Sequence, residues 1–134
     1  MTLVSLKRHS DWGLLALRLA IGAIFLYHGL TKWPLNPEAP WYMTVVAIAE
    51  PLGGLAMILG LLTQWAALGL GIIMLGAIYM KMTGFGQAAL DVFGTFVRQG
   101  GTGWEFDLMI LAGCIALLLM GGGKMALDAM MGRK

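Results

Sequence analysis

Side chains that could donate, accept or carry protons stand within otherwise apolar stretches of this 134-residue chain. His28 and Lys32 are four residues apart, so on a helix they share one face and are separated by about 6 Å along its axis. Glu50 is followed directly by Pro51, whose missing N–H leaves the carbonyl of Ala47 without its usual donor. A histidine near a buried carboxylate is a suitable pair for proton transfer near neutral pH.

Two later stretches bring further polar groups. Tyr79 and Lys81 end one of them, and Glu105 and Asp107 begin the other. Two residues on a helix span about 200° of rotation, so Glu105 and Asp107 cannot both face a bundle interior, and we take Glu105 as the inward residue. The sequence predicts a polar pocket with these candidate ligand-binding residues: His28, Lys32, Glu50, Tyr79, Lys81 and Glu105.

Each candidate also has a purely structural interpretation. Lys32 and Lys81 are suited to reach the membrane surface by snorkelling, and Tyr79 to sit in an interfacial aromatic belt. His28 and Glu50 are suited to a hydrogen bond that only holds two helices together. A charge at membrane depth costs at least about 2.5 kcal/mol, so Glu50 must be paired, protonated or hydrated. Arg18, near the other end of its stretch, is expected to snorkel to cytoplasmic headgroups.

Ligand counting argues against two kinds of site. A bis-histidine haem needs two intramembrane histidines, and only His28 qualifies because His9 precedes the apolar stretch, so no haem is expected on this chain alone. No H-x-x-x-H or E-x-x-H spacing supports a metal site, and none is assigned. The single cysteine, Cys114, has no disulfide partner and is expected to be a packing residue. No catalytic residue is assigned.

The elements that must position these residues are membrane helices. The chain is 59% hydrophobic and 12% charged, against roughly 25% charged in ordinary globular proteins. Four apolar blocks, at about 12–32, 41–62, 64–82 and 104–121, are long enough to cross a hydrocarbon core of about 30 Å. All five tryptophans lie at block ends, as expected for headgroup-level indoles. The sequence therefore predicts one all-α domain, residues 1–134, forming an integral membrane four-helix bundle.

The connections and small residues add detail to this bundle. The segment 33–40 is rich in proline, Thr63-Gln64 makes a tight hairpin, and residues 83–103 are compatible with either a short interfacial helix or an irregular loop. Small residues at four-residue spacing predict helix contact faces, because membrane helices associate by close packing. These faces are Ala49-x-x-x-Gly53, Ala56-x-x-x-Gly60 and Ala67-x-x-x-Gly71.

The distribution of basic residues predicts the orientation. Four crossings put both termini on one side, together with Lys7, Arg8, Lys124, Arg133 and Lys134, whereas the other side holds Lys32, Lys81 and Arg98. The positive-inside bias places both termini in the cytoplasm and opens the polar pocket to the outer leaflet. The net charge of +2 is small and the basic residues lack interleaved aromatics, so nucleic acid is not an expected partner.

Read in order, the sequence resembles the DoxX family over nearly its whole length. The matching segments are Leu17-Arg18-Leu19-Ala20-Ile21-Gly22, His28-Gly29 with Lys32, Glu50-Pro51-Leu52-Gly53-Gly54, Leu59-Gly60-Leu61-Leu62-Thr63, Gly103-Trp104-Glu105, and Gly121-Gly122-Gly123 with Leu127-Asp128. The family's polar positions fall on Arg18, His28, Gly29, Lys32, Glu50, Gly53, Gly54, Glu105 and Asp128. Tyr79, Lys81 and Asp107 have no firm counterpart.

The resemblance implies a small bacterial inner-membrane protein. Relatives include the membrane subunit of a thiosulfate:quinone oxidoreductase and a membrane partner of thiol-redox and superoxide-detoxifying proteins. The leading functional expectation is a redox subunit whose pocket admits a quinone headgroup, with His28 or Lys32 donating to a quinone oxygen and Glu50 or Glu105 handling a proton. Such a subunit needs a partner protein to supply electrons.

Two other classes of function stay open. The first is a non-enzymatic anchor or assembly partner, whose glycine-lined faces hold another membrane protein or a second copy of the chain. The second is a carrier or channel for a small apolar or anionic solute, which four short helices without an inverted repeat support poorly.

Overall fold

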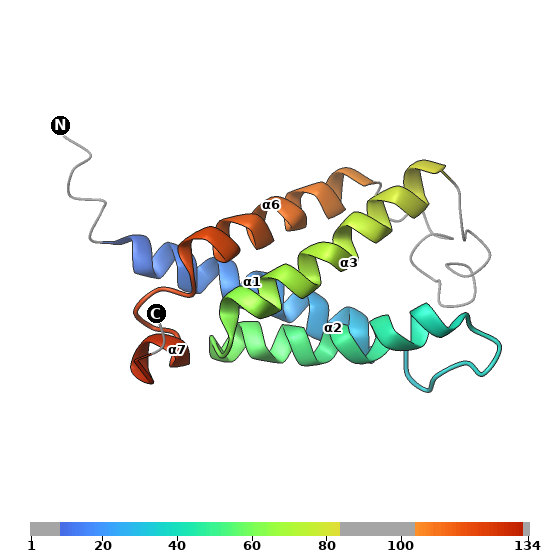
Figure 1. Cartoon of the computed structure of the whole chain (residues 1–134), viewed down its shortest axis with the longest axis horizontal. Coiled ribbons are helices and arrows are strands. Elements are labelled where there is room, and N and C mark those ends of the chain that lie inside the picture. Colours follow the sequence, from blue (N-terminus) through green and yellow to red (C-terminus); the bar gives the residue numbers. More distant parts are fainter. Residues whose placement is uncertain (1–8, 84–103, 133–134) are drawn as a thin grey trace.

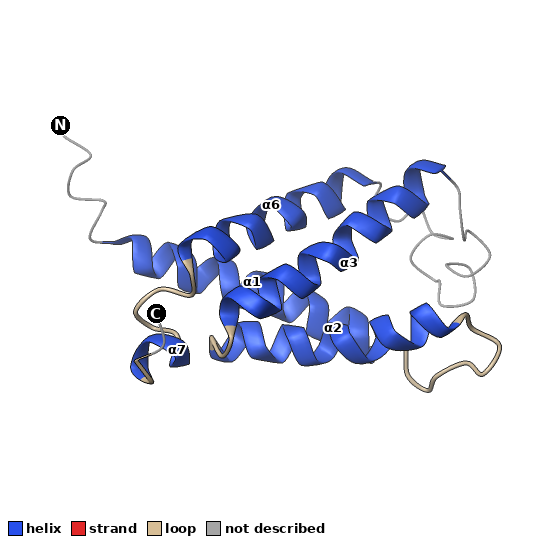
Figure 2. Ribbon diagram, viewed as in Figure 1, coloured by secondary structure: helices blue, strands red, loops and turns tan. Residues whose placement is uncertain are grey.

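The computed structural model describes residues 9–83 and 104–132, and within these ranges the chain is helical with no strand (Figure 2). The elements are α1 Ser10–Leu30, α2 Trp41–Leu59, α3 Thr63–Thr83, α6 Trp104–Met120 and the short α7 Leu127–Met130 (Figure 1). Both interpretations of residues 83–103, helix or loop, fall almost entirely outside the described residues.

Helices α1, α2 and α3 are each long and apolar enough to cross a membrane. The fourth long helix, α6, has 17 residues and packs mainly against α3, whereas α1 packs mainly against α2. The predicted all-α membrane bundle is therefore confirmed. All five tryptophans are well exposed at helix ends, between 39% for Trp104 and 78% for Trp41, as residues facing lipid headgroups should be.

Different segments of the chain meet at the two ends of the bundle (Figure 1). The tail end consists of the start of α1, the connection between α2 and α3, and residues 121–132. The loop end consists of the connection 31–40, the end of α3 and the start of α6. This arrangement brings together the four helix ends that carry the predicted polar residues.

Two helix boundaries differ from the sequence prediction. Helix α2 ends at Leu59 rather than near 62, because Gly60 adopts φ 70° and Leu62 also has a positive φ of 51°. Helix α1 ends at Leu30, and Lys32 lies in the turn that follows.

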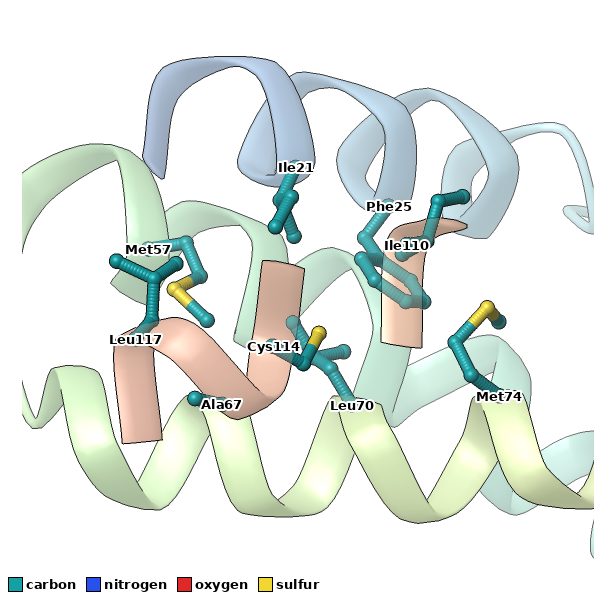
Figure 3. Close-up of a cluster of buried hydrophobic side chains, with 9 residues drawn as sticks. All are labelled: Ile21, Phe25, Met57, Ala67, Leu70, Met74, Ile110, Cys114 and Leu117. Carbon is teal, nitrogen blue, oxygen red and sulfur yellow. The ribbon is translucent and has the colours of Figure 1, made fainter. Parts of the chain in front are cut away.

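The centre of the bundle is a cluster of buried apolar side chains from all four long helices (Figure 3). Its members are Ile21, Phe25, Met57, Ala67, Leu70, Met74, Ile110, Cys114 and Leu117. Cys114 is 1% exposed and lies in this cluster as a free thiol, where the sequence placed it.

The closest helix contact is between α1 and α2 and depends on glycine. A Cβ atom on Gly29 would lie 2.2 Å from Cδ of Pro51, and one on Gly54 would lie 2.6 Å from the backbone nitrogen of Leu26. Among the predicted small-residue faces, a Cβ on Gly53 would lie 2.8 Å from Cδ2 of Leu70, whereas one on Gly71 would lie 3.6 Å from Cβ of Cys114, an ordinary contact distance. The backbones of α1 and α2 can touch only because these positions lack side chains.

Candidate functional site

The first feature of the loop end is an ion pair between Lys32 and Glu50. Nζ of Lys32 contacts Oε2 of Glu50 and also donates to the carbonyl of His28 at 3.1 Å. Glu50 is 5% exposed, so the carboxylate is buried but paired. The pair forms because Gly29 seats the end of α1 directly on Pro51, which brings the next turn of the chain over Glu50.

The carbonyl that Pro51 leaves without a donor is satisfied from outside its helix. The indole Nε1 of Trp33 donates a hydrogen bond to the oxygen of Ala47 at 3.2 Å. The missing donor for the Ala47 carbonyl follows from the position of Pro51 in the sequence. The sequence does not indicate that Trp33 replaces this donor, because a tryptophan at the end of an apolar block already has an explanation as an interfacial residue. Trp33 therefore holds the connection 31–40 against α2.

A second ion pair joins α3 to α6. Nζ of Lys81 lies 2.6 Å from Oδ2 of Asp107, with side-chain exposures of 23% and 8%. As expected, only one of Glu105 and Asp107 faces inward, but that residue is Asp107, and Glu105 is exposed. Helix α6 is apolar nearly all round beyond its first turn, so its sequence gave little indication of which face turns inward.

His28 lies near enough to both pairs to be influenced by their charges. Its side chain is partly buried, and it interacts electrostatically with Lys32, Lys81 and Asp107. The loop end thus holds a cluster of five polar residues contributed by α1 and the turn after it, α2, α3 and α6. We call this the polar cluster: His28, Lys32, Glu50, Lys81 and Asp107.

Four of the six candidate residues belong to the polar cluster, and two do not. Tyr79 is 59% exposed, and Glu105 is exposed at the start of α6. Among the described residues, no group of three or more histidine, cysteine, aspartate or glutamate side chains has the arrangement of a metal site. The cluster can donate protons and hydrogen bonds through two lysines and accept them through two carboxylates.

The tail end contains a second polar network that the sequence did not reveal. Arg18 was expected to snorkel to headgroups, but that expectation is wrong, because the side chain is 1% exposed and donates from Nη2 to the carbonyl of Met125 at 3.2 Å. Asp128 accepts hydrogen bonds from the backbone N–H groups of Leu62 and Thr63, both at 2.7 Å. Residues 121–132 therefore fold back and cap the start of α3.

The fold and the polar cluster together define a class: small all-α membrane proteins in which lysine–carboxylate pairs lie inside the bundle. The family profile described as DoxX matches residues 13–83, which is more than half of the chain, and the chain belongs to the DoxX family. The chain is also 29% identical to an uncharacterized membrane protein of Mycobacterium tuberculosis over 137 aligned residues, covering 90% of this chain and 82% of the relative. No solved structure matches the chain.

Proposed function

We propose that this DoxX protein is a quinone-interacting membrane subunit of a redox system in the bacterial inner membrane, with the polar cluster as its ligand site. The observation that carries the proposal is the convergence of two lysine–carboxylate pairs and one histidine at one end of an otherwise apolar bundle. Charges at this depth are costly, and intramembrane ionisable residues commonly mark proton or substrate sites.

The cluster is complementary to both forms of a quinone. The two carbonyl oxygens of the oxidised form accept hydrogen bonds, which the ammonium groups of Lys32 and Lys81 donate. The two hydroxyl groups of the quinol donate, and the carboxylates of Glu50 and Asp107 accept. Reduction of a quinone consumes two electrons and two protons, one proton at each oxygen. Each of the two pairs offers one donor and one acceptor for this exchange.

The electrons in this proposal come from a partner protein. The chain has one cysteine, Cys114, which lies in the core and has no second thiol with which to cycle. The partner would oxidise a sulfur or thiol compound, or a product of oxidative stress, and pass two electrons to the quinone. The family resemblance supports this assignment, since it implies membrane subunits of sulfur and thiol redox systems.

The test is ligand binding by purified protein in mild detergent. Mass spectrometry would identify co-purified lipid-soluble molecules, and short-chain ubiquinone and menaquinone would be titrated into wild type, His28→Ala, Glu50→Gln and Asp107→Asn. We expect binding in wild type and at least tenfold weaker binding in the three variants, with Glu105→Gln unchanged because that side chain lies outside the cluster. Equal binding by all five proteins would overturn the proposal.

A second function is favoured by the way in which the pairs are distributed. One pair ties the end of α1 to α2, and the other ties α3 to α6, as cross-links in a non-enzymatic anchor would. The variant Lys32→Met/Glu50→Leu distinguishes the two functions, because an apolar replacement of a buried pair is often neutral for stability. A folded variant that loses quinone binding supports a site. A folded variant that still captures its protein partner without any quinone requirement supports the anchor.

The orientation is part of the proposal: both termini in the cytoplasm and the polar cluster toward the outer leaflet. The counts of lysine and arginine on the two sides support it. A single cysteine at position 134, in a Cys114→Ser background, would be labelled by a membrane-impermeant maleimide only after the cells are opened. Labelling of intact cells would reverse the orientation without affecting the ligand site.

A further inference from the structure

A cavity of about 720 Å³ opens at the tail end. Figure 1 shows that the tail end and the loop end lie at opposite ends of the bundle. Its wall is contributed by the start of α1, the start of α3, the end of α6 and the segment that returns to α7. Polar and apolar side chains share the lining: Ser10, Asp11, Thr63, Gln64, Lys124 and Asp128 on one hand, and Leu14, Leu62, Trp65 and Met120 on the other.

We propose that this cavity binds the headgroup of a phospholipid carrying a primary ammonium, as in phosphatidylethanolamine. The inference is independent of the proposed redox function. The chemistry that it requires is one fixed carboxylate for the ammonium, one cation for the phosphate and an apolar wall for the start of an acyl chain.

Asp11 and Lys124 supply the two charges. Oδ1 of Asp11 accepts the backbone N–H of Lys124 at 3.0 Å, which fixes the position of the carboxylate. Its other oxygen, Oδ2, lies 3.7 Å from Nζ of Lys124, a loose contact in which the lysine side chain is 89% exposed. The lysine can therefore turn toward a phosphate while the ammonium of the lipid takes its place beside Asp11.

The other carboxylate of the lining, Asp128, is already committed. Its two oxygens accept the N–H groups of Leu62 and Thr63, each at 2.7 Å. The ammonium is therefore assigned to Asp11 rather than to Asp128.

Thr63 gives an independent indication of a ligand. The residue is 1% exposed, it lines the cavity, and its Oγ1 has no hydrogen-bond partner. A buried hydroxyl without a partner is unfavourable, so such groups are normally satisfied by protein, water or ligand. The oxygen is enclosed beside Gly122, so a small shift of Gly122 would be needed before an ester or phosphate oxygen of a lipid could accept its proton.

The apolar part of the wall places the cavity at the depth of lipid headgroups. Trp65 is 72% exposed and Met120 is 62% exposed, so both present apolar surface beside the polar lining. Exposed tryptophan at a helix end marks the interface between headgroups and acyl chains. A small water-soluble zwitterion would leave this apolar surface unused, which is why the occupant is assigned as a lipid.

The experiment is native mass spectrometry of the full chain in detergent with equal amounts of phosphatidylethanolamine, phosphatidylcholine and phosphatidylglycerol of the same acyl composition. We expect wild type to retain phosphatidylethanolamine over phosphatidylglycerol, and Asp11→Asn to reduce this preference by about threefold to fivefold, the effect of one partly exposed ion pair. Lys124→Ala should weaken retention of all three lipids to a similar extent. Lys124 is almost fully exposed, so this variant tests the site even if Asp11→Asn impairs folding.

The control is Glu105→Gln, which removes an exposed carboxylate at the loop end and should leave the lipid preference unchanged. Equal retention of the three lipids by wild type, unaltered by Asp11→Asn and Lys124→Ala, would overturn the proposal. Competition by free phosphoethanolamine as effective as that of the intact lipid would also overturn it, because the site would then recognise a soluble zwitterion.

Discussion

The two ends of the bundle are held together by different kinds of polar contact. At the loop end, side chains pair with side chains across helices: Lys32 with Glu50, and Lys81 with Asp107. At the tail end, the buried side chains bond to backbone: Asp128 caps two amides at the start of α3, and Arg18 donates to the carbonyl of Met125. The pair of Asp11 and Lys124 at this end is a loose contact of 3.7 Å in which the lysine is exposed.

This difference indicates which end is suited to chemistry. A backbone amide or carbonyl cannot change its charge, so the buried contacts at the tail end fix the position of the chain and are not suited to exchange with a ligand. Either member of a lysine–carboxylate pair can exchange its partner for a ligand, because an ammonium can donate to other acceptors and a carboxylate can accept from other donors. The buried contacts of the loop end are therefore exchangeable, whereas the buried contacts of the tail end are structural, and only its exposed pair of Asp11 and Lys124 can exchange.

The largest effect is expected for Glu50→Ala. Removing the carboxylate leaves the ammonium of Lys32 without its partner at membrane depth, and breaking a buried pair on one side typically costs about 3–5 kcal/mol. The free energy of unfolding would be measured in mixed micelles of dodecylmaltoside and sodium dodecyl sulfate by circular dichroism. Glu105→Ala, an exposed carboxylate of the same end, is the matched control. A loss for Glu50→Ala no larger than that of the control would show that the pair contributes no stability.

At the tail end, Gly60→Ala is expected to cost about 1–3 kcal/mol through its backbone alone, because Gly60 has φ 70°. The added Cβ would also lie 1.6 Å from Nη1 of Arg18, so the guanidinium must move. The same unfolding measurement applies. Gly69→Ala, where no heavy atom lies within 4 Å, should be neutral or slightly stabilising. Equal behaviour of the two variants would contradict both the positive φ of Gly60 and the packing of Arg18 against this turn.

A smaller effect is expected for Asp128→Ala, which removes both acceptors that cap α3 and should cost about 2 kcal/mol at most. Asp128→Asn keeps one acceptor oxygen and should cost roughly half as much. Hydrogen exchange of the Leu62 and Thr63 amides, followed by nuclear magnetic resonance in micelles, gives a local measurement. Unchanged exchange in Asp128→Ala would contradict the assignment of Asp128 as a cap.

The helices could be predicted from the sequence because they depend on local composition. The family could be predicted because its characteristic residues recur in the same order along the chain. The depth match of His28, Lys32 and Glu50 followed from helix geometry and the positions of the apolar blocks. The choice between Glu105 and Asp107 did not follow from the sequence. Their spacing predicts that one of them faces inward but not which one, and the rest of their helix has no polar face that would indicate its orientation.

The network around Arg18 could not be predicted for a different reason. Its contact with Met125 joins residues 107 positions apart, and it depends on the return of residues 121–132 to the bundle. A lone arginine near a helix end has an adequate local explanation in snorkelling. Only the three-dimensional path of the chain shows that Arg18 is buried instead.

The smallest effect concerns a bond from a side chain to the backbone at the loop end, the bond from the indole of Trp33 to the carbonyl of Ala47. Trp33→Phe keeps an aromatic ring at the interface and removes only the N–H, so it should cost about 0.5–1.5 kcal/mol, the net value of one hydrogen bond. Trp12→Phe is the matched control, because Trp12 is also an exposed interfacial residue, at 62%. If both substitutions cost the same, Trp33 acts only as an interfacial anchor. A larger cost at Trp33 would show that the loop end also has a fixed contact between a side chain and the backbone.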